Sequence, residues 1–212
     1  LSYFPVAPHY PFDGTPQQFR KFRLGQMGDY TAPYLNELLY MDWVVSSIVG
    51  ELKNSGLLDN TLVIITDDHG EMLGANGGPI GHGWAATPDL VNIPLIIMVP
   101  GRPGYHVNLT VGSQVDLLPT VLDLLGIPLP AGELSQCSSL YSAGKQTERN
   151  IYLNSFNEYA VVENHEFLHG NRETESSTSC SFDVFTFTNN GAKALFYKAN
   201  PADLSNPSIS EF

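Results

Sequence analysis

Positive charge is scarce in this sequence of 212 residues. Ten lysines and arginines stand against 22 aspartates and glutamates, so the formal net charge is −12 at pH 7. A chain of this charge repels nucleic acid and anionic lipid surfaces, which excludes both as partners bound by charge alone. If the protein handles an anionic ester, it needs a metal or local cations to compensate.

Cysteines and long apolar runs are also scarce. No uncharged apolar run reaches the roughly 18 residues typical of a membrane span, and the first residues do not resemble a signal peptide. Cys137 and Cys180 permit one disulfide, which the sequence leaves open, and neither has metal-ligand spacing. With 42% apolar and 15% charged residues, the sequence predicts a soluble globular α/β domain.

The stretch at residues 61–83, TLVIITDDHGEMLGANGGPIGHG, is where we expect the chemistry. Residues 62–65 are apolar and β-branched, which predicts a strand buried on both faces, as in the middle of a parallel sheet. Open α/β sheets bind ligands at the carboxyl ends of their strands. Four residues with ligand or acid–base side chains follow at that end: Asp67, Asp68, His69 and Glu71.

Asp68 and His69 are candidate ligands of one metal ion. Neighbouring residues of a regular strand point to opposite faces, so the pair can share an ion only if the ladder breaks, which Gly70 permits. A carboxylate with an imidazole suits zinc or manganese better than calcium. His82, after a glycine-rich loop, could return to the same place. The alternative interpretation is a polar turn with a capping aspartate and a solvated histidine.

The remaining periodicities predict one α/β domain. Apolar residues between positions 35 and 52 predict a helix packed on the sheet, with Asp42 at its boundary and an end at residues 54–56. Residues 93–99 predict a second buried strand, and Asp116 is expected to cap a helix at residues 117–125. Alternation predicts short antiparallel strands at residues 150–155, 159–163, 182–188 and 192–197. His165 and His169 are expected on hairpin and loop surfaces.

Four segments occur in a telling order: TLVIITDDHGEMLG, GHG, IPLIIMVPG and SQVDLLPTVLDLLGIPLP. Over roughly residues 5–130 the chain resembles the C-terminal half of the catalytic domain of the sulfatase-like branch of the alkaline phosphatase superfamily. That branch includes sulfatases, lipoteichoic acid synthases and phosphoethanolamine transferases. The resemblance implies an alkaline-phosphatase-like mixed sheet flanked by helices, with residues 131–212 forming an extension that carries a small antiparallel sheet.

The resemblance also implies roles for single residues. Asp68 and His69 correspond to the metal ligands of the family, and Asp67 to a turn or outer position. His9, in an H-x-P setting, corresponds to a histidine that contacts the phosphate or sulfate, although the residues alone favour an exposed histidine in a proline-rich loop. His82 is expected to bind the ester and to act in catalysis.

The resemblance further implies an enzyme that hydrolyses or transfers a phosphate or sulfate ester through a covalent intermediate. We expect the nucleophile upstream of this chain, which would then be a fragment inactive alone, and a membrane anchor in the missing N-terminal part of an extracytoplasmic protein. No lysine lies between His69 and Pro94, where sulfatases place one. This favours phosphoester chemistry on a substrate such as a phospholipid head group. The alternatives are a sulfatase, a non-catalytic anion- or lipid-binding relative, and a generic α/β domain.

Overall fold

The computed structural model describes residues 1–23, 30–74, 79–83, 85–102, 111–128, 137–142, 150–155, 158–163, 166–171, 182–188 and 191–199. The chain divides into two compact units, Leu1–His82 with Pro94–Pro103 and Gly83–Ile93 with Gly104–Phe212. No helix among the described residues is long and apolar enough to cross a membrane.

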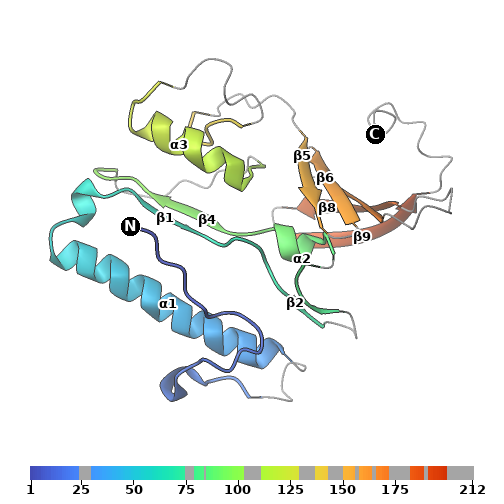
Figure 1. The fold of residues 1–212 in the computed structure, drawn as a ribbon, viewed down its shortest axis with the longest axis horizontal. Helices are drawn as coiled ribbons and strands as arrows, with labels where there is room; N and C mark the ends of the chain where they lie inside the picture. Colours follow the sequence, from blue (N-terminus) through green and yellow to red (C-terminus); the bar gives the residue numbers. More distant parts are fainter. Residues whose placement is uncertain are drawn as a thin grey trace. The chain divides into compact units, whose positions relative to one another are not determined.

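The predicted central strand of the first unit is β1, Val63–Thr66. It pairs with β4, Leu95–Met98, and the two run antiparallel, with Val63 opposite Met98 and Thr66 opposite Leu95 (Figure 1). The prediction of a parallel neighbourhood with both faces buried is therefore wrong for the described residues. All four side chains of β1 are half-buried, because a ribbon of two short strands has little sheet around it to cover them.

The predicted helix is α1, Thr31–Asn54. It ends where predicted, because Gly56 adopts a left-handed conformation with φ of 70°. The Gly56 amide donates to the Lys53 carbonyl over 3.1 Å, and the Leu57 amide donates to the Leu52 carbonyl over 2.9 Å. These two bonds form a Schellman motif, which satisfies carbonyls that the helix end would otherwise leave unpaired. The turn continues into a short 3₁₀ helix, η2, Leu58–Asn60.

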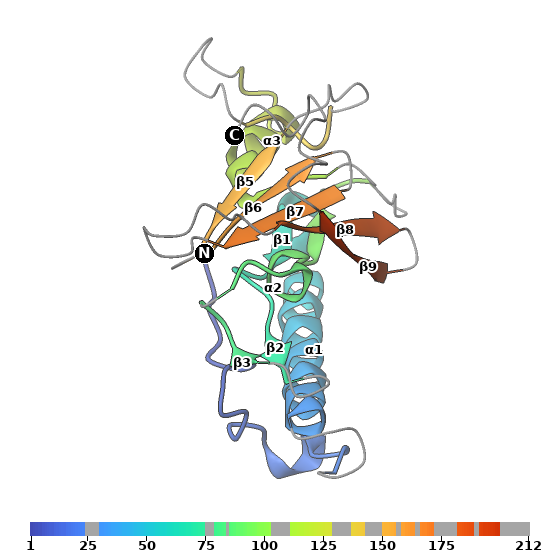
Figure 2. The ribbon, with the colours of Figure 1, turned by 90° about the vertical axis from the view of Figure 1, so that its right-hand side faces the viewer.

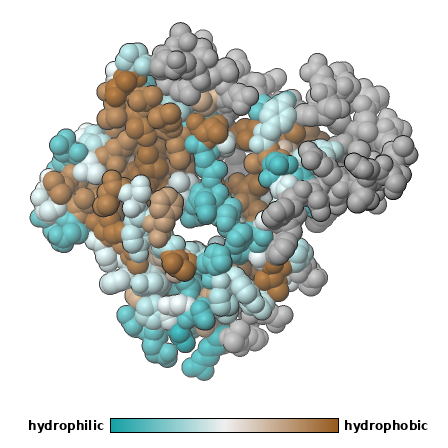
Figure 3. All heavy atoms as spheres, in the orientation of Figure 1, coloured by the Kyte–Doolittle hydropathy of each residue, from teal (hydrophilic) through white to brown (hydrophobic). Residues whose placement is uncertain are grey.

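The outer face of α1 differs from the prediction. Leu38, Leu39 and Ile48 were expected to pack on the sheet but are 39%, 37% and 40% exposed, and Asp42 is exposed rather than at a boundary. The reason is length: 24 helical residues span about 36 Å, whereas four strand residues span about 14 Å. Figure 3 also shows hydrophobic side chains at the surface of the face that it draws.

The inner face of α1 holds the N-terminal segment through polar groups. The Asn36 side-chain oxygen accepts the amides of Lys21 and Phe22 over 2.7 and 2.8 Å, and its nitrogen donates to the Phe22 carbonyl over 2.9 Å. Beside it, the buried Glu37 carboxylate accepts a 2.8 Å bond from the Thr15 hydroxyl. Together they fix a segment that contains only one short 3₁₀ helix, η1, Gln17–Phe19.

A hairpin follows β1 in the first unit. Strands β2, Met72–Leu73, and β3, Ile80–Gly81, are antiparallel, with Met72 opposite Gly81 and Leu73 opposite Ile80. The sequence predicted only a glycine-rich loop here, because two-residue strands are too short to show alternation. Gly81 has a φ of 96°, a conformation that side chains strongly disfavour, which explains glycine immediately before His82.

The second unit is built on a meander of five antiparallel strands. Figure 2 shows β5, β6, β7, β8 and β9 side by side in that order. Their bounds are Ile151–Asn154, Glu158–Glu163, Glu166–Asn171, Phe182–Thr188 and Gly191–Ala199. The predicted antiparallel sheet is confirmed, but β7 was missed and His169 lies in that strand rather than in a loop. His165 and Cys180 lie outside the described residues.

The core of the second unit joins β5 and β6 to a segment far away in the sequence. Ala86 packs with Ile151, Ala160 and Val162, and all four are less than a tenth exposed. Two polar contacts add to this packing: the Ala86 amide donates to the Glu158 carboxylate over 2.7 Å, and the Ser155 hydroxyl donates to the Gly83 carbonyl over 2.6 Å. The short helix α2, Pro88–Val91, follows directly.

Asp116 is a structural residue, though not in the predicted way. The helix it precedes is α3, Leu117–Leu124, and its side chain caps no amide of that helix. Instead it completes a capping box with Ser113 around the 3₁₀ turn η4, Gln114–Asp116, and accepts the Ser138 amide over 2.9 Å. The carboxylate points back because amides of two other segments reach it first, and this explains its complete burial.

We predict that Asn36→Ala lowers the free energy of unfolding by about 2 kcal/mol, because two amides and a carbonyl of the N-terminal segment lose their buried partner. Urea denaturation measures the change. Asn54→Ala, the same substitution at an exposed position of α1, is the control and should change stability by no more than about 0.5 kcal/mol. Equal losses in the two variants would contradict the anchoring role.

We predict an acid-sensitive contribution from Asp123 in α3. Hydrogen bonds from Ser139 and Ser142 hold the pKa of this carboxyl below its ordinary value of 3.8. A lowered folded-state pKa stabilises the protein above the unfolded-state pKa, and the effect is lost as the pH falls through the folded-state value. Asp123→Asn should therefore be less stable than wild type at pH 7, and the difference should shrink below about pH 4 in urea titrations. Asp42→Asn, an exposed carboxylate, is the control.

Candidate metal and ester site

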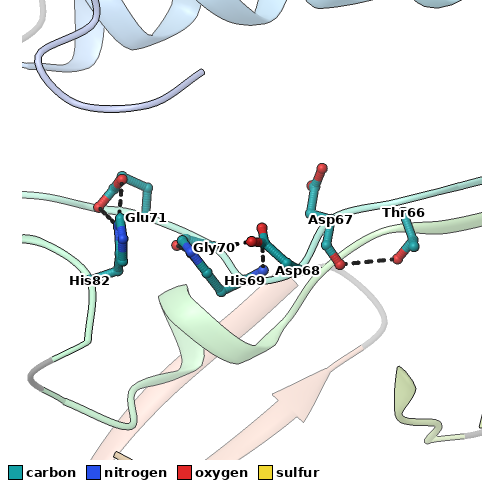
Figure 4. Close-up of polar contacts among 7 residues, drawn as sticks. All are labelled: Thr66, Asp67, Asp68, His69, Gly70, Glu71 and His82. Atoms are coloured by element: carbon teal, nitrogen blue, oxygen red, sulfur yellow. Dashed lines mark hydrogen bonds and ion pairs between the residues drawn. The ribbon is translucent and has the colours of Figure 1, made fainter. Parts of the chain in front are cut away.

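The site begins where β1 ends. The Thr66 hydroxyl donates to the Pro94 carbonyl over 2.9 Å, which ties the last residue of β1 to the start of β4. The chain then leaves the ladder, so that the next residues are in no strand. Freed from the alternation of a strand, neighbouring side chains can turn to one side, as Asp68 and His69 do in Figure 4.

Asp68 and His69 lie together in a geometry that fits one cation. The Asp68 carboxylate oxygen Oδ2 and His69 Nε2 are 3.6 Å apart. Two ligand atoms that each lie about 2 Å from a shared ion are at most about 4 Å apart, so the separation fits. The other carboxylate oxygen accepts the His69 amide over 3.0 Å. This bond holds the carboxylate against the turn.

The His69 ring is oriented by the backbone. Its Nδ1 lies 2.8 Å from the Gly70 carbonyl, to which only an N–H can donate. The proton of the neutral ring is therefore on Nδ1, and Nε2 keeps the lone pair that a metal ligand needs. Among the described residues, no group of three or more histidine, cysteine, aspartate or glutamate side chains could hold a metal. The described residues thus bring together two candidate ligands, Asp68 and His69.

His82 reaches the same place through the β2–β3 hairpin. Its Nδ1 lies 3.2 and 3.4 Å from the two carboxylate oxygens of Glu71 (Figure 4). The His82 ring lies against the His69 ring, with centroids 4.1 Å apart. Glu71 and His82, which are 11 positions apart in the sequence, are therefore neighbours in space.

His9 completes a row of three histidines. Its ring is perpendicular to that of His82, with centroids 5.4 Å apart. The His9 Nδ1 lies 2.7 Å from the Tyr10 carbonyl, which orients the ring as Gly70 orients His69. Phe12 is buried at the end of this loop, and its amide donates to the His9 carbonyl over 2.9 Å. All four predicted site residues, Asp68, His69, His82 and His9, thus lie near one another.

Negative charge is concentrated around this row. Burial raises the pKa of Asp67, the Asp68 carboxylate raises it further, and His69 opposes the change. Burial also raises the pKa of the Tyr34 hydroxyl, with further contributions from Asp67 and Glu71. Tyr34, from α1, therefore stays protonated and presents a hydrogen-bond donor near the carboxylates. The sequence carried no signal for Tyr34, and the contact of Glu71 depends on the pairing of β2 with β3, which the sequence did not predict.

A model of the sulfatase family matches residues 1–127, which is more than half of the chain. The chain belongs to the sulfatase family. This sulfatase-family chain is 34% identical over 119 residues to the choline-sulfatase of Rhizobium meliloti, covering 56% of itself and 21% of that protein. It is 27% identical over 227 residues to the lipoteichoic acid synthase of Staphylococcus aureus, covering 96% of itself and 34% of that protein.

The fold is also similar to that of a solved structure. The phosphonate monoester hydrolase of Silicibacter pomeroyi superimposes with a TM-score of 0.63 at 20% identity, over 85% of this chain and 39% of that one. The predicted alkaline-phosphatase-like fold is therefore confirmed. The sulfatase-family chain spans about a fifth to two fifths of the length of these three relatives.

We predict that Asp68→Ala and His69→Ala each remove bound zinc or manganese from the natural full-length protein, because each removes one of the paired donor atoms. Metal analysis after exhaustive dialysis measures the content. Circular dichroism should show a folded protein in both cases, since both residues lie outside the strands and the core. Asp42→Ala on α1 is the control. Wild-type metal content in either variant would show that the ion, if present, is held elsewhere.

Proposed function

We propose that this chain is part of an enzyme that hydrolyses or transfers phosphate or sulfate esters at a divalent metal held by Asp68 and His69. The observation that carries the proposal is the 3.6 Å separation of the two donor atoms, with His82 packed against His69. Membership of the sulfatase family supports the ester chemistry. The carboxylate–imidazole pair favours zinc or manganese over calcium.

Each side chain of the site has a role that follows from its chemistry. Asp68 and His69 would hold the metal, which when bound would supply charge neutralisation on the transferring group and a lowered pKa of the attacking group. In their protonated forms, His9 and His82 donate Nε2–H to non-bridging oxygens of the ester, and His82 passes its Nε2 proton to the leaving oxygen. The covalent nucleophile comes from another part of the full-length protein, and water or a second alcohol then completes hydrolysis or transfer.

Phosphoesters are the favoured substrates in this proposal. A lysine between His69 and Pro94 is absent, and His82 occupies the hairpin end instead. An imidazole can both donate and accept a proton, which suits an ester whose leaving oxygen must be protonated. A phosphoethanolamine or glycerophosphate head group has the required chemistry. The similarity to a lipoteichoic acid synthase over 96% of the chain supports this choice.

Two alternatives stay open. Hydrolysis of sulfate esters is supported by the 34% identity to a choline-sulfatase. A non-catalytic relative that binds anions or lipids is supported by the presence of only two paired ligands among the described residues. The proposal also places the protein outside the cytoplasm, with an N-terminal membrane anchor in its full-length form, as the resemblance to envelope enzymes implies.

The test is a paired assay of the natural full-length protein with an aryl phosphate and an aryl sulfate ester. Each assay is run after chelation and again with zinc, manganese or calcium restored. We expect zinc or manganese to restore activity, with a higher kcat/KM for the phosphate ester. His69→Ala should lower kcat/KM on the order of 10³-fold, because the metal contributes several kcal/mol to catalysis.

Three other outcomes would each redirect the proposal. Preference for the aryl sulfate would identify a sulfatase. Binding of phosphate without turnover of either ester would identify a non-catalytic relative. Full activity of the metal-free protein would refute the metal-dependent mechanism.

A further inference from the structure

Glu71 is the most enclosed carboxylate of the site. Its side chain is 5% exposed, whereas that of Asp68 is 82% exposed. A carboxylate enclosed to this extent is costly unless a donor faces it. The donor is His82, whose Nδ1 lies within reach of both carboxylate oxygens.

The pairing of β2 with β3 brings these two side chains together. Met72 lies opposite Gly81 and Leu73 opposite Ile80, and the Gly74 amide continues the pairing by donating to the Pro79 carbonyl over 3.1 Å. The same register makes Glu71 and His82 the next opposed pair. Opposed residues of antiparallel strands have Cβ atoms about 5 Å apart, which is within reach of a glutamate and an imidazole. The contact is thus a consequence of backbone register.

We propose that Glu71 is a positioning residue for His82. Its carboxylate accepts a hydrogen bond from Nδ1–H, which selects one tautomer of the neutral ring. Nε2 is then the nitrogen that takes up a proton from solvent and passes it to the leaving oxygen, while the contact with Glu71 holds the ring in place. The His69 ring, 4.1 Å away, limits rotation of His82 from the other side. This inference rests on the proposed function for the role of His82, but the tautomer itself does not depend on catalysis.

Three variants of the natural full-length protein test the proposal. Glu71→Ala removes the acceptor, Glu71→Gln keeps an acceptor oxygen at nearly the same volume, and Glu51→Gln is a control at an exposed position of α1. Long-range ¹H–¹⁵N spectra of the histidine rings report the tautomer of His82. Metal content, kcat and KM for the aryl phosphate are measured on the same samples.

We expect the neutral His82 ring to carry its proton on Nδ1 in wild type, in Glu71→Gln and in Glu51→Gln, and to shift towards the Nε2–H form in Glu71→Ala. The metal content should be unchanged. The kcat per metal-loaded site should fall about 10- to 100-fold in Glu71→Ala, the range seen when the carboxylate behind a functional histidine is removed. Glu71→Gln should recover most of that loss.

An unchanged His82 tautomer in Glu71→Ala would overturn the proposal. Loss of metal from Glu71→Gln would also overturn it, because Glu71 would then be a ligand. If wild type turns over neither ester but the tautomer still depends on Glu71, the proposed function fails and the positioning role stands. If Glu71→Ala does not fold, the wild-type spectrum decides, because a neutral His82 ring with its proton on Nε2 there would overturn the proposal.

Discussion

The end of the β1 ladder at Thr66 is the constraint on which the site depends. In a continued strand, Asp68 and His69 would point to opposite faces and could not approach one atom. The bond from the Thr66 hydroxyl to the Pro94 carbonyl fixes the last paired residue, and the backbone beyond it is free to turn. Because the strand ends there, Asp68 Oδ2 and His69 Nε2 can lie 3.6 Å apart. A longer strand would have been more stable locally and would have separated the pair.

Each of the three histidine rings of the site is oriented by a neighbouring oxygen atom. His69 and His9 each have a backbone carbonyl beside Nδ1, while His82 has a carboxylate there. All three rings therefore have one nitrogen already engaged and the other available. Such prior orientation reduces the rotamer entropy lost when a ligand binds. The Asn36 contacts act at longer range, by fixing residues 21 and 22 on α1, downstream of the loop that carries His9.

The sequence predicts the local features of this protein, such as helix ends and strands, better than the tertiary contacts that these features make. The end of α1 was predictable because Gly56 suits a left-handed cap, and the strands at residues 151–154 and 182–188 because alternation survives in them. The antiparallel pairing of β1 with β4 was not predictable, because an apolar run indicates burial but not the direction of the neighbouring strand. Asp116 shows the same limit, because a capping residue can bond forwards or backwards and tertiary contacts decide which.

In the candidate site, too, the sequence indicates which residues have suitable side chains but not which of them lie together. Asp68, His69 and His82 were identified from residue type and from the resemblance, whereas Glu71 acquires a role only through the strand pairing that places it opposite His82. Tyr34 lies on a helix about thirty residues before the carboxylates that raise its pKa. No local pattern in a sequence links residues so far apart, and three-dimensional packing is required to bring them together.

Charge gives the remaining reason to expect a cation at this place. Asp67, Asp68 and Glu71 concentrate negative charge within five residues of a chain whose net charge is −12. An anionic ester brought to this cluster would be repelled, by about 4 kcal/mol per charge pair at 4 Å for an effective dielectric constant of 20. The three histidines could offset only part of this, and Glu71 is already paired with one of them. A divalent metal between Asp68 and His69 would offset two of these three negative charges and place a positive centre beside the ester, so an anion repelled by the metal-free site would be held at the loaded one.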